Sequence, residues 1–170
     1  MGWVTLTLRK TELKRTHADY QMELLEISRK KRQMARQNHY EQSVARNNGN
    51  AKLDSLFVNY EQDLDAAMGV IEGTYTTNAD GSKTADQQQY ESAQHDYAQV
   101  KNNYEHEKML AQREMEEELA RLEQEANEIE TQLDQEQVQV EAQLEAISAE
   151  MEAVGEAISS QIQASTIKLS

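Results

Sequence analysis

The residues best suited to metal binding or acid-base chemistry near neutral pH are four histidines: His17, His39, His95 and His106. None belongs to a His-x3-His or His-Glu-x2-His arrangement, the helical spacings that bring two imidazoles to one ion. His95 and His106 lie about three helical turns apart, so they can share a helix face without touching. We therefore expect these histidines to lie on the surface or between packed helices without binding a metal. We expect no metal and no cofactor.

Acidic side chains crowd the run from Glu114 to Glu130. Carboxylates along an extended helix face do not converge on one cation, and Ca²⁺ needs a loop that folds oxygen ligands inward. The segment 78–82 resembles the start of such a loop, but Gln89 stands at the position that should be acidic. The acidic run is therefore interpreted as a solvated helix face.

The sequence lacks the residues and motifs of the common nucleophilic and phosphate-binding sites. The chain has no Cys and no Gly-x-Ser-x-Gly context, and its six Gly residues form no phosphate-cradling loop. We therefore expect no catalytic site, and the protein is predicted not to be an enzyme.

Charge is divided unevenly along the chain. The net charge is -14, but residues 1–50 hold ten Lys or Arg against five acids, about +5, which leaves about -19 for the rest. The cluster Arg29, Lys30, Lys31 and Arg32, with Arg36, could bind nucleic acid or an anionic membrane. The acidic stretch 123–145 is expected to neutralise it, so the partner predicted here is protein and not nucleic acid.

The elements that position these side chains are helices. Apolar residues are only 38% of the chain and aromatics 5%, Pro is absent, and the apolar residues of segment 84–164 recur in steps of three and four. That rhythm is typical of a coiled coil, with two stutters near Val140 and Ile158. The predicted coiled-coil seam consists of Tyr90, Tyr97, Val100, Tyr104, Met115, Leu119, Leu122, Ile129, Leu133, Val140, Leu144, Ile147, Met151, Val154 and Ile158.

The segment 9–72 repeats the same rhythm and is predicted to be the partner helical arm. Its seam residues are Tyr20, Leu24, Ile27, Leu53, Phe57, Tyr60, Leu64 and Ile71. Asn47, Asn48 and Gly49 predict a break near 47–50. Gly73 is expected to end the arm, and Thr84 with Gln87 to start the next helix as a capping box.

Between the arms, residues 73–83 are predicted to form a tip loop. Thr and Tyr residues flank Asn78-Ala79-Asp80-Gly81, a tight-turn sequence in which Gly81 can adopt a positive φ. A short β-turn or β-hairpin is therefore expected there. The predicted fold is all-α: an elongated antiparallel helical hairpin or coiled coil, with the basic residues 29–36 beside the acidic stretch 123–145.

The two ends alternate apolar and polar residues in the manner of strands, so residues 1–8 and 165–170 are predicted to be strand-like. Such strands could pair with each other or with a neighbouring subunit. The candidate assembly contacts are Trp3, Val4, Leu6, Ile162, Ile167 and Leu169. No Sec-type signal and no membrane span are expected, which suggests a cytoplasmic protein or one exported without a cleaved Sec signal.

A two-helix hairpin buries one seam, and apolar residues such as Met22, Leu25, Val58, Met109 and Val138 are left over on its flanks. We therefore expect a structural or assembly protein, a homo-oligomer or part of a larger protein assembly. Paired helices, no Cys, few aromatics and a middle loop resemble the axial subunits that type III-type export machines assemble into needles and filaments, without a shared motif. The alternatives are a cytoplasmic coiled-coil adaptor, stalk or export chaperone, and a virion scaffolding or tail component.

Overall fold

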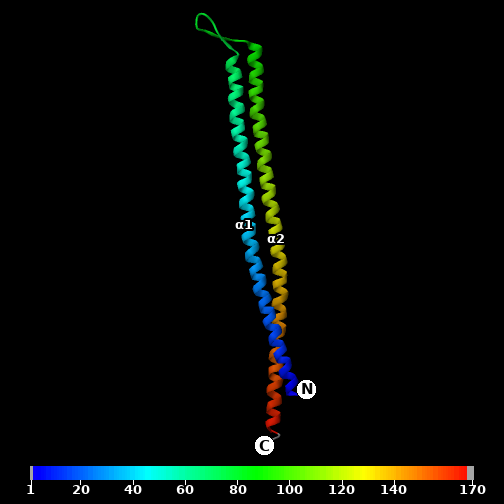
Figure 1. Ribbon diagram of the computed structural model, residues 1–170. Helices are drawn as coiled ribbons and strands as arrows, with labels where there is room; N and C mark the ends of the chain where they lie inside the picture. Colours follow the sequence, from blue (N-terminus) through cyan, green and yellow to red (C-terminus); the bar gives the residue numbers. More distant parts are fainter. Residues whose placement is uncertain (1, 168–170) are drawn as a thin grey trace. The chain divides into compact units, whose positions relative to one another are not determined.

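A computed structural model describes residues 2–167 of the chain, with side chains through residue 165. Helix α1 (Trp3–Gly73, 71 residues) and helix α2 (Gln87–Ile167, 81 residues) are joined by the strands β1 (Tyr75–Thr77) and β2 (Lys83–Ala85), which form a small antiparallel hairpin (Figure 1). The chain is therefore an all-α helical hairpin, in agreement with the sequence prediction.

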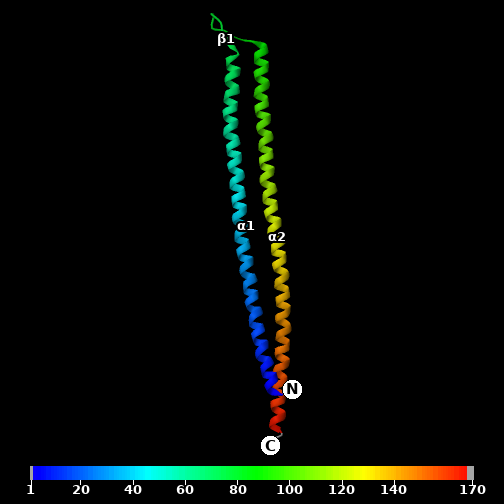
Figure 2. The same cartoon turned by 45° about the vertical axis from the view of Figure 1, so that its right-hand side comes forward.

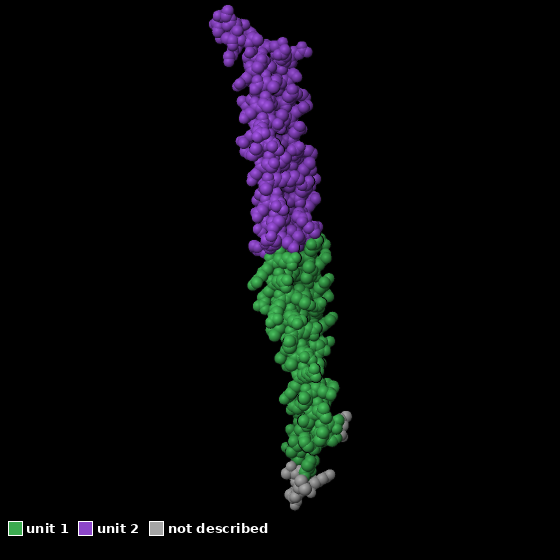
Figure 3. All heavy atoms as spheres, viewed as in Figure 1, with its two compact units in different colours: residues 1–38, 124–170 green, residues 39–123 purple. Residues whose placement is uncertain are grey.

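The chain divides into two compact units, each built from both helices (Figure 3). Unit 1 comprises Met1–Asn38 and Gln124–Ser170, and unit 2 comprises His39–Glu123. Within each unit the α1 and α2 stretches lie side by side and run in opposite directions, as two views show (Figures 1 and 2). Neither helix, over its described residues, contains an apolar stretch long enough to cross a membrane.

The break predicted near 47–50 is wrong, because α1 continues without interruption from Trp3 to Gly73. Two Asn and one Gly cost up to about 1 kcal/mol each in a helix interior. Such costs are small beside the tertiary packing that stabilises most protein helices. Gly49 is half-buried against Met115 of α2, so this glycine serves close packing and not a turn.

The strand-like prediction for residues 1–8 is also wrong. Residues 3–8 form the first turns of α1, where the Thr7 hydroxyl donates a hydrogen bond to the Trp3 carbonyl oxygen at 2.9 Å. Hydroxyl bonds of this i−4 kind satisfy Thr within a helix. The apolar rhythm also reaches back to Leu6, which is half-buried, so helical packing prevails over the β propensity of isolated residues.

At the other end, residues 165–167 continue α2 instead of forming a strand. The Ser165 hydroxyl donates to the Gln161 carbonyl oxygen at 2.6 Å, again within the helix. The rest of the predicted strand-like tail, residues 168–170, lies outside the described residues. The two ends therefore offer no paired strands over the part of the chain that the structure describes.

The tip contains the predicted turn. Thr76 pairs with Thr84, and the backbone N–H of Gly81 donates to the Asn78 carbonyl oxygen at 3.0 Å. Gly81 has a φ of 81°, the left-handed conformation that glycine adopts at little cost. The prediction of a short β-hairpin at the tip, closed by Asn78-Ala79-Asp80-Gly81, is confirmed.

The N-cap of α2 differs from the sequence prediction. Asp86, and not Thr84, caps α2: its Oδ1 accepts the backbone N–H groups of Gln88 and Gln89 at 3.1 and 3.2 Å. Thr84 is unavailable because it is paired in β2. The helix α1 ends at Gly73 as predicted, and the buried Thr74 that follows donates its hydroxyl to the Ile71 carbonyl oxygen at 2.7 Å.

Candidate protein-interaction surfaces

The seam of unit 1 is a narrow apolar core between α1 and α2. Ile27, Leu133 and Val140 are buried and form one cluster, and Ile27 is only 2% exposed. The partly buried residues packed against this cluster are Tyr20, Leu24, Met34 and Leu144. Each helix contributes one stripe, so the core is a single residue layer deep.

The seam of unit 2 relies on small and aromatic side chains. Ala93 and Ala111 are buried, and Leu122 is buried near the end of the unit. Tyr60 and Tyr104 stack with their ring centroids 4.2 Å apart, an arrangement that adds to the hydrophobic contribution of the rings. Small buried alanines and stacked tyrosine rings therefore both contribute to this seam.

Most of the predicted seam residues are withdrawn from solvent. Those buried or half-buried on α2 are Tyr90, Tyr97, Val100, Tyr104, Met115, Leu119, Leu122, Leu133, Val140, Leu144, Ile147, Met151, Val154 and Ile158. Those on α1 are Tyr20, Leu24, Ile27, Leu53, Tyr60, Leu64 and Ile71. Residues at three- and four-residue spacing thus lie on one face of each helix.

Two predicted seam residues, Ile129 and Phe57, are exposed instead. Leu56 is half-buried in place of Phe57. Both residues fit the helix face between Leu53 and Tyr60, because the two intervals can be three then four residues or four then three. The Phe57 ring still meets the edge of Tyr104, with centroids 6.4 Å apart. Spacing alone did not distinguish the two neighbours.

The candidate assembly contacts at the chain ends are mostly in solvent. Trp3, Val4 and Ile162 are exposed and Leu6 is half-buried. The side chains of Ile167 and Leu169 lie outside the described residues. The exposed Trp3 and Val4 belong to the first turn of α1 and remain open to a further partner.

Polar residues also lie in the seam of unit 1, among them His17, Lys31 and Gln137. Lys31 of α1 is half-buried, and its Nζ donates to Asp134 Oδ1 at 2.5 Å and to Gln137 Oε1 at 2.6 Å, both on α2. A lysine at a seam position sets register at some cost in stability. Lys31 thereby specifies which part of α2 lies beside it.

Ion pairs across the seam are few among the described residues. In unit 1 they are Lys31–Asp134 and Arg9–Glu150, the latter with Arg9 Nη2 at 2.7 Å from Glu150 Oε1. In unit 2 Lys52 pairs with Glu114. The exposed pairs Arg9–Glu150 and Lys52–Glu114 each contribute at most about 1 kcal/mol, so the apolar seam carries most of the stability.

The basic cluster lies beside the acidic stretch 123–145, as predicted, because Lys31 pairs with Asp134, but not every basic side chain of the cluster forms an ion pair. Lys31 alone of the cluster pairs with α2. Arg29, Lys30, Arg32 and Arg36 are exposed and form no ion pair with a described residue. Lys31 shares the seam face with Ile27, whereas Arg29 is two residues on from Ile27, roughly 200° round the helix.

The remaining features that could bind an ion or a small ligand are the histidines and a hollow in unit 2. Among the described residues no group of three or more His, Asp or Glu side chains is placed to hold a metal ion. Of the four histidines, His17 is half-buried and the others are exposed. A hollow of about 410 Å³ in unit 2 opens between Val70, Thr74 and Asp96, and Asp96 is its one charged lining residue.

The tip contains one carboxylate with a perturbed pKa. Asp80 Oδ1 accepts the Ser82 hydroxyl at 2.6 Å and the Ser82 backbone N–H at 3.0 Å, and these bonds lower the pKa of Asp80. A lowered folded-state pKa stabilises the hairpin above the ordinary carboxyl value of about 3.9. This contribution is lost as the pH falls through the folded-state pKa.

We expect Ser82→Ala to raise the pKa of Asp80 toward its usual range, because the hydroxyl bond is the largest cause of the shift. An NMR titration of the Asp80 carboxyl measures it directly. Ser92→Ala, at an exposed serine of α2, is the matched control and should leave the Asp80 pKa unchanged. An unchanged pKa in Ser82→Ala would contradict the assigned cause.

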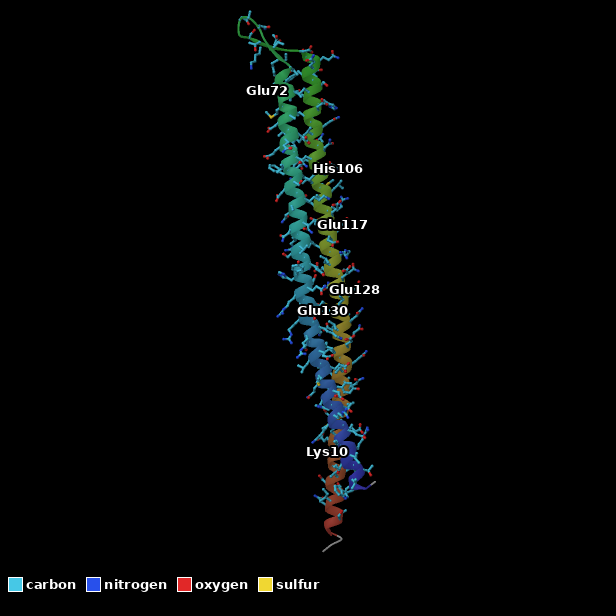
Figure 4. The ribbon with its side chains drawn as sticks, viewed as in Figure 1. Lys10, Glu72, His106, Glu117, Glu128 and Glu130 are labelled. Atoms are coloured by element: carbon cyan, nitrogen blue, oxygen red, sulfur yellow. The ribbon has the colours of Figure 1, made fainter. Side chains whose placement is uncertain are left out.

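Comparison with known proteins adds no relative: no family model, no curated protein and no solved structure matches the chain. Its surfaces must therefore be interpreted from their own chemistry. These are one narrow seam in each unit, an unpaired basic row on α1, an acidic α2, and large apolar side chains in solvent. Figure 4 shows the side chains projecting from both helices, with Lys10 on α1 and Glu128 and Glu130 on α2.

Proposed function

We propose that this chain is a non-enzymatic structural or assembly protein, a coiled-coil subunit that self-associates into a larger protein assembly. The observation that carries the proposal is the number of large apolar side chains outside the seams. They are spread over both units and include Leu8, Met22, Leu25, Val58, Met68, Val70, Met109, Leu110 and Val138. Met22 and Leu25 share a helix face, and Met109 and Leu110 are adjacent in sequence. Exposed apolar side chains that gather in this way mark protein contact sites.

The seams support the coiled-coil part of the proposal. Half-buried or buried α2 residues follow one another as Leu133, Gln137, Val140, Leu144 and Ile147, in alternating steps of four and three. That alternation is the spacing by which coiled-coil helices keep one stripe toward a partner. A seam one layer deep leaves the outer faces of both helices free to pack against further helices.

The exposed charges favour protein partners over a solitary hairpin. Residues 3–38 carry nine Lys or Arg against four acids, whereas residues 124–167 carry many acids and no Lys or Arg. Unit 1 therefore presents one basic helix and one acidic helix. Complementary charge of this kind steers association and fixes register more than it adds affinity.

The test is sedimentation velocity with multi-angle light scattering over a ~100-fold concentration range, since mass action makes association concentration-dependent. We expect the weight-average mass to rise with concentration. A single species of constant mass throughout the range would contradict self-association and favour the alternative, an adaptor or stalk that binds a different protein along the hairpin.

A further inference from the structure

Unit 1 carries an outer stripe on α1 that turns away from α2. Met22, Leu25, Arg29, Arg32 and Arg36 follow one another in steps of three and four, so they share one helix face. All five are exposed, and Met22 and Leu25 are 63% and 59% exposed. We call this row the α1 outer stripe; it is apolar in its first turn and basic thereafter.

The α2 helix of the same unit carries a complementary row. Val138, Glu145, Glu152 and Glu156 are exposed and lie on the face of α2 away from the seam residues Val140, Leu144 and Ile147. Val138 is 64% exposed, and none of the three glutamates pairs with a described Lys or Arg. We call this row the α2 outer stripe.

The two rows match in period as well as in charge. Met22, Arg29 and Arg36 recur every seven residues on α1, and Val138, Glu145 and Glu152 recur every seven residues on α2. With the two helices parallel and Met22 set opposite Val138, Arg29 faces Glu145 and Arg36 faces Glu152. Within one chain each stripe faces away from the seam and so from the opposite helix, and the two stripes do not meet.

We propose that the α1 outer stripe of one copy binds the α2 outer stripe of a second copy, in this parallel register. The inference rests on the proposed self-association and specifies its contact. Because α1 and α2 of one chain are antiparallel, neighbouring copies run in opposite directions. Each copy keeps one stripe of each kind, so the contact is heterologous and can continue from copy to copy.

A second copy fits better than nucleic acid or a membrane. The net charge of -14 opposes approach to phosphates, whereas the acidic α2 outer stripe belongs to the same chain and is present at equal concentration. The apolar start of each stripe also finds a match, Met22 with Val138, that a phosphate backbone would not offer.

Charge reversal tests the contact. Arg29→Glu with Arg36→Glu makes both stripes acidic, and Glu145→Arg with Glu152→Arg makes both basic, so each double variant should associate about tenfold or more weakly than the unaltered protein. An equimolar mixture of the two double variants restores opposite charges at every contact and should recover association. All four positions are exposed, so circular dichroism at 222 nm should show unchanged helix content in each variant.

Engineered cysteines test the register, because the chain has no Cys of its own. Under mild oxidation, a mixture of Met22→Cys protein and Val138→Cys protein should yield a covalent dimer. Met22→Cys mixed with Ser159→Cys is the matched control, since Ser159 would face Met22 only if the paired helices ran antiparallel. Cross-linking of the control pair in place of the first pair would overturn the parallel register.

The outcomes separate this inference from the proposed function. A protein that stays at one mass at every concentration overturns both. If both double variants self-associate as strongly as the unaltered protein, the stripe contact is overturned, while the proposed function stands. Binding to phosphatidylserine vesicles that is lost in Arg29→Glu with Arg36→Glu, while self-association persists, would assign the α1 outer stripe to a membrane and likewise overturn the inference.

Discussion

Replacing Ile27 with Ala is expected to lower the free energy of unfolding by about 2–5 kcal/mol. Ile27 is 2% exposed and packs in one cluster with Leu133 and Val140. The substitution removes buried methyl and methylene groups and leaves a space between α1 and α2. Because the core is one layer deep, no second layer of side chains can move in to fill that space.

The matched control is Ile129→Ala in the same unit. Ile129 is 45% exposed, so the same change in side chain should cost less than about 1 kcal/mol. Both substitutions gain the same small helix propensity, which cancels in the comparison. Urea unfolding followed at 222 nm at a fixed, low protein concentration gives both values; equal losses would contradict the seam described for unit 1.

Ile27 and Ile129 also show how far spacing could predict the seam. Both fit steps of three and four, yet only Ile27 is buried. A helix has 3.6 residues per turn, so a stripe drifts against a strict seven-residue repeat. Between Ala126 and Leu133 the seam face falls between Ile129 and Glu130, and neither is withdrawn from solvent. The pattern predicts a face to within one residue, and packing decides which neighbour occupies it.

Local propensity failed where tertiary packing opposed it. Asn47, Asn48 and Gly49 favour a break, and Trp3 to Leu8 favour a strand, but both segments are helical. In each segment the three- and four-residue rhythm continues, through Gly49 in one and Leu6 in the other. Packing against α2 stabilises both segments as helix. The sequence of a segment alone does not show which helix will pack against it.

The first residue of α2 could not be predicted from the sequence, for a different reason. Thr84 and Asp86 are both good N-cap residues, two positions apart. The pairing of Thr76 with Thr84 in the hairpin fixes which of them is free to cap, and this pairing depends on the turn at Gly81. Helix caps next to a hairpin are therefore set by strand register as well as by residue type.

Leucine at Gly49 is expected to destabilise unit 2, in contrast to leucine at Gly69. A β-carbon on Gly49 would lie 2.7 Å from Met115 Cγ and closer still to its sulfur, whereas a β-carbon on Gly69 would meet nothing within 4 Å. Overpacking typically costs about 1–3 kcal/mol. Both substitutions gain about 0.8 kcal/mol of helix propensity, so the difference between the two variants isolates the overlap with Met115.

A double-mutant cycle identifies Met115 as the cause. Met115→Ala should destabilise the unaltered protein, because Met115 is half-buried, and should destabilise Gly49→Leu less, because it removes the overlap. We expect a coupling of about 1–3 kcal/mol between the two positions, measured by urea unfolding of the four proteins. Additive effects, or equal stability of Gly49→Leu and Gly69→Leu, would mean that α1 and α2 do not approach each other at Gly49. A close approach here explains why a residue that weakens a free helix stands inside α1: the space that its missing side chain leaves is filled by Met115 of the opposite helix.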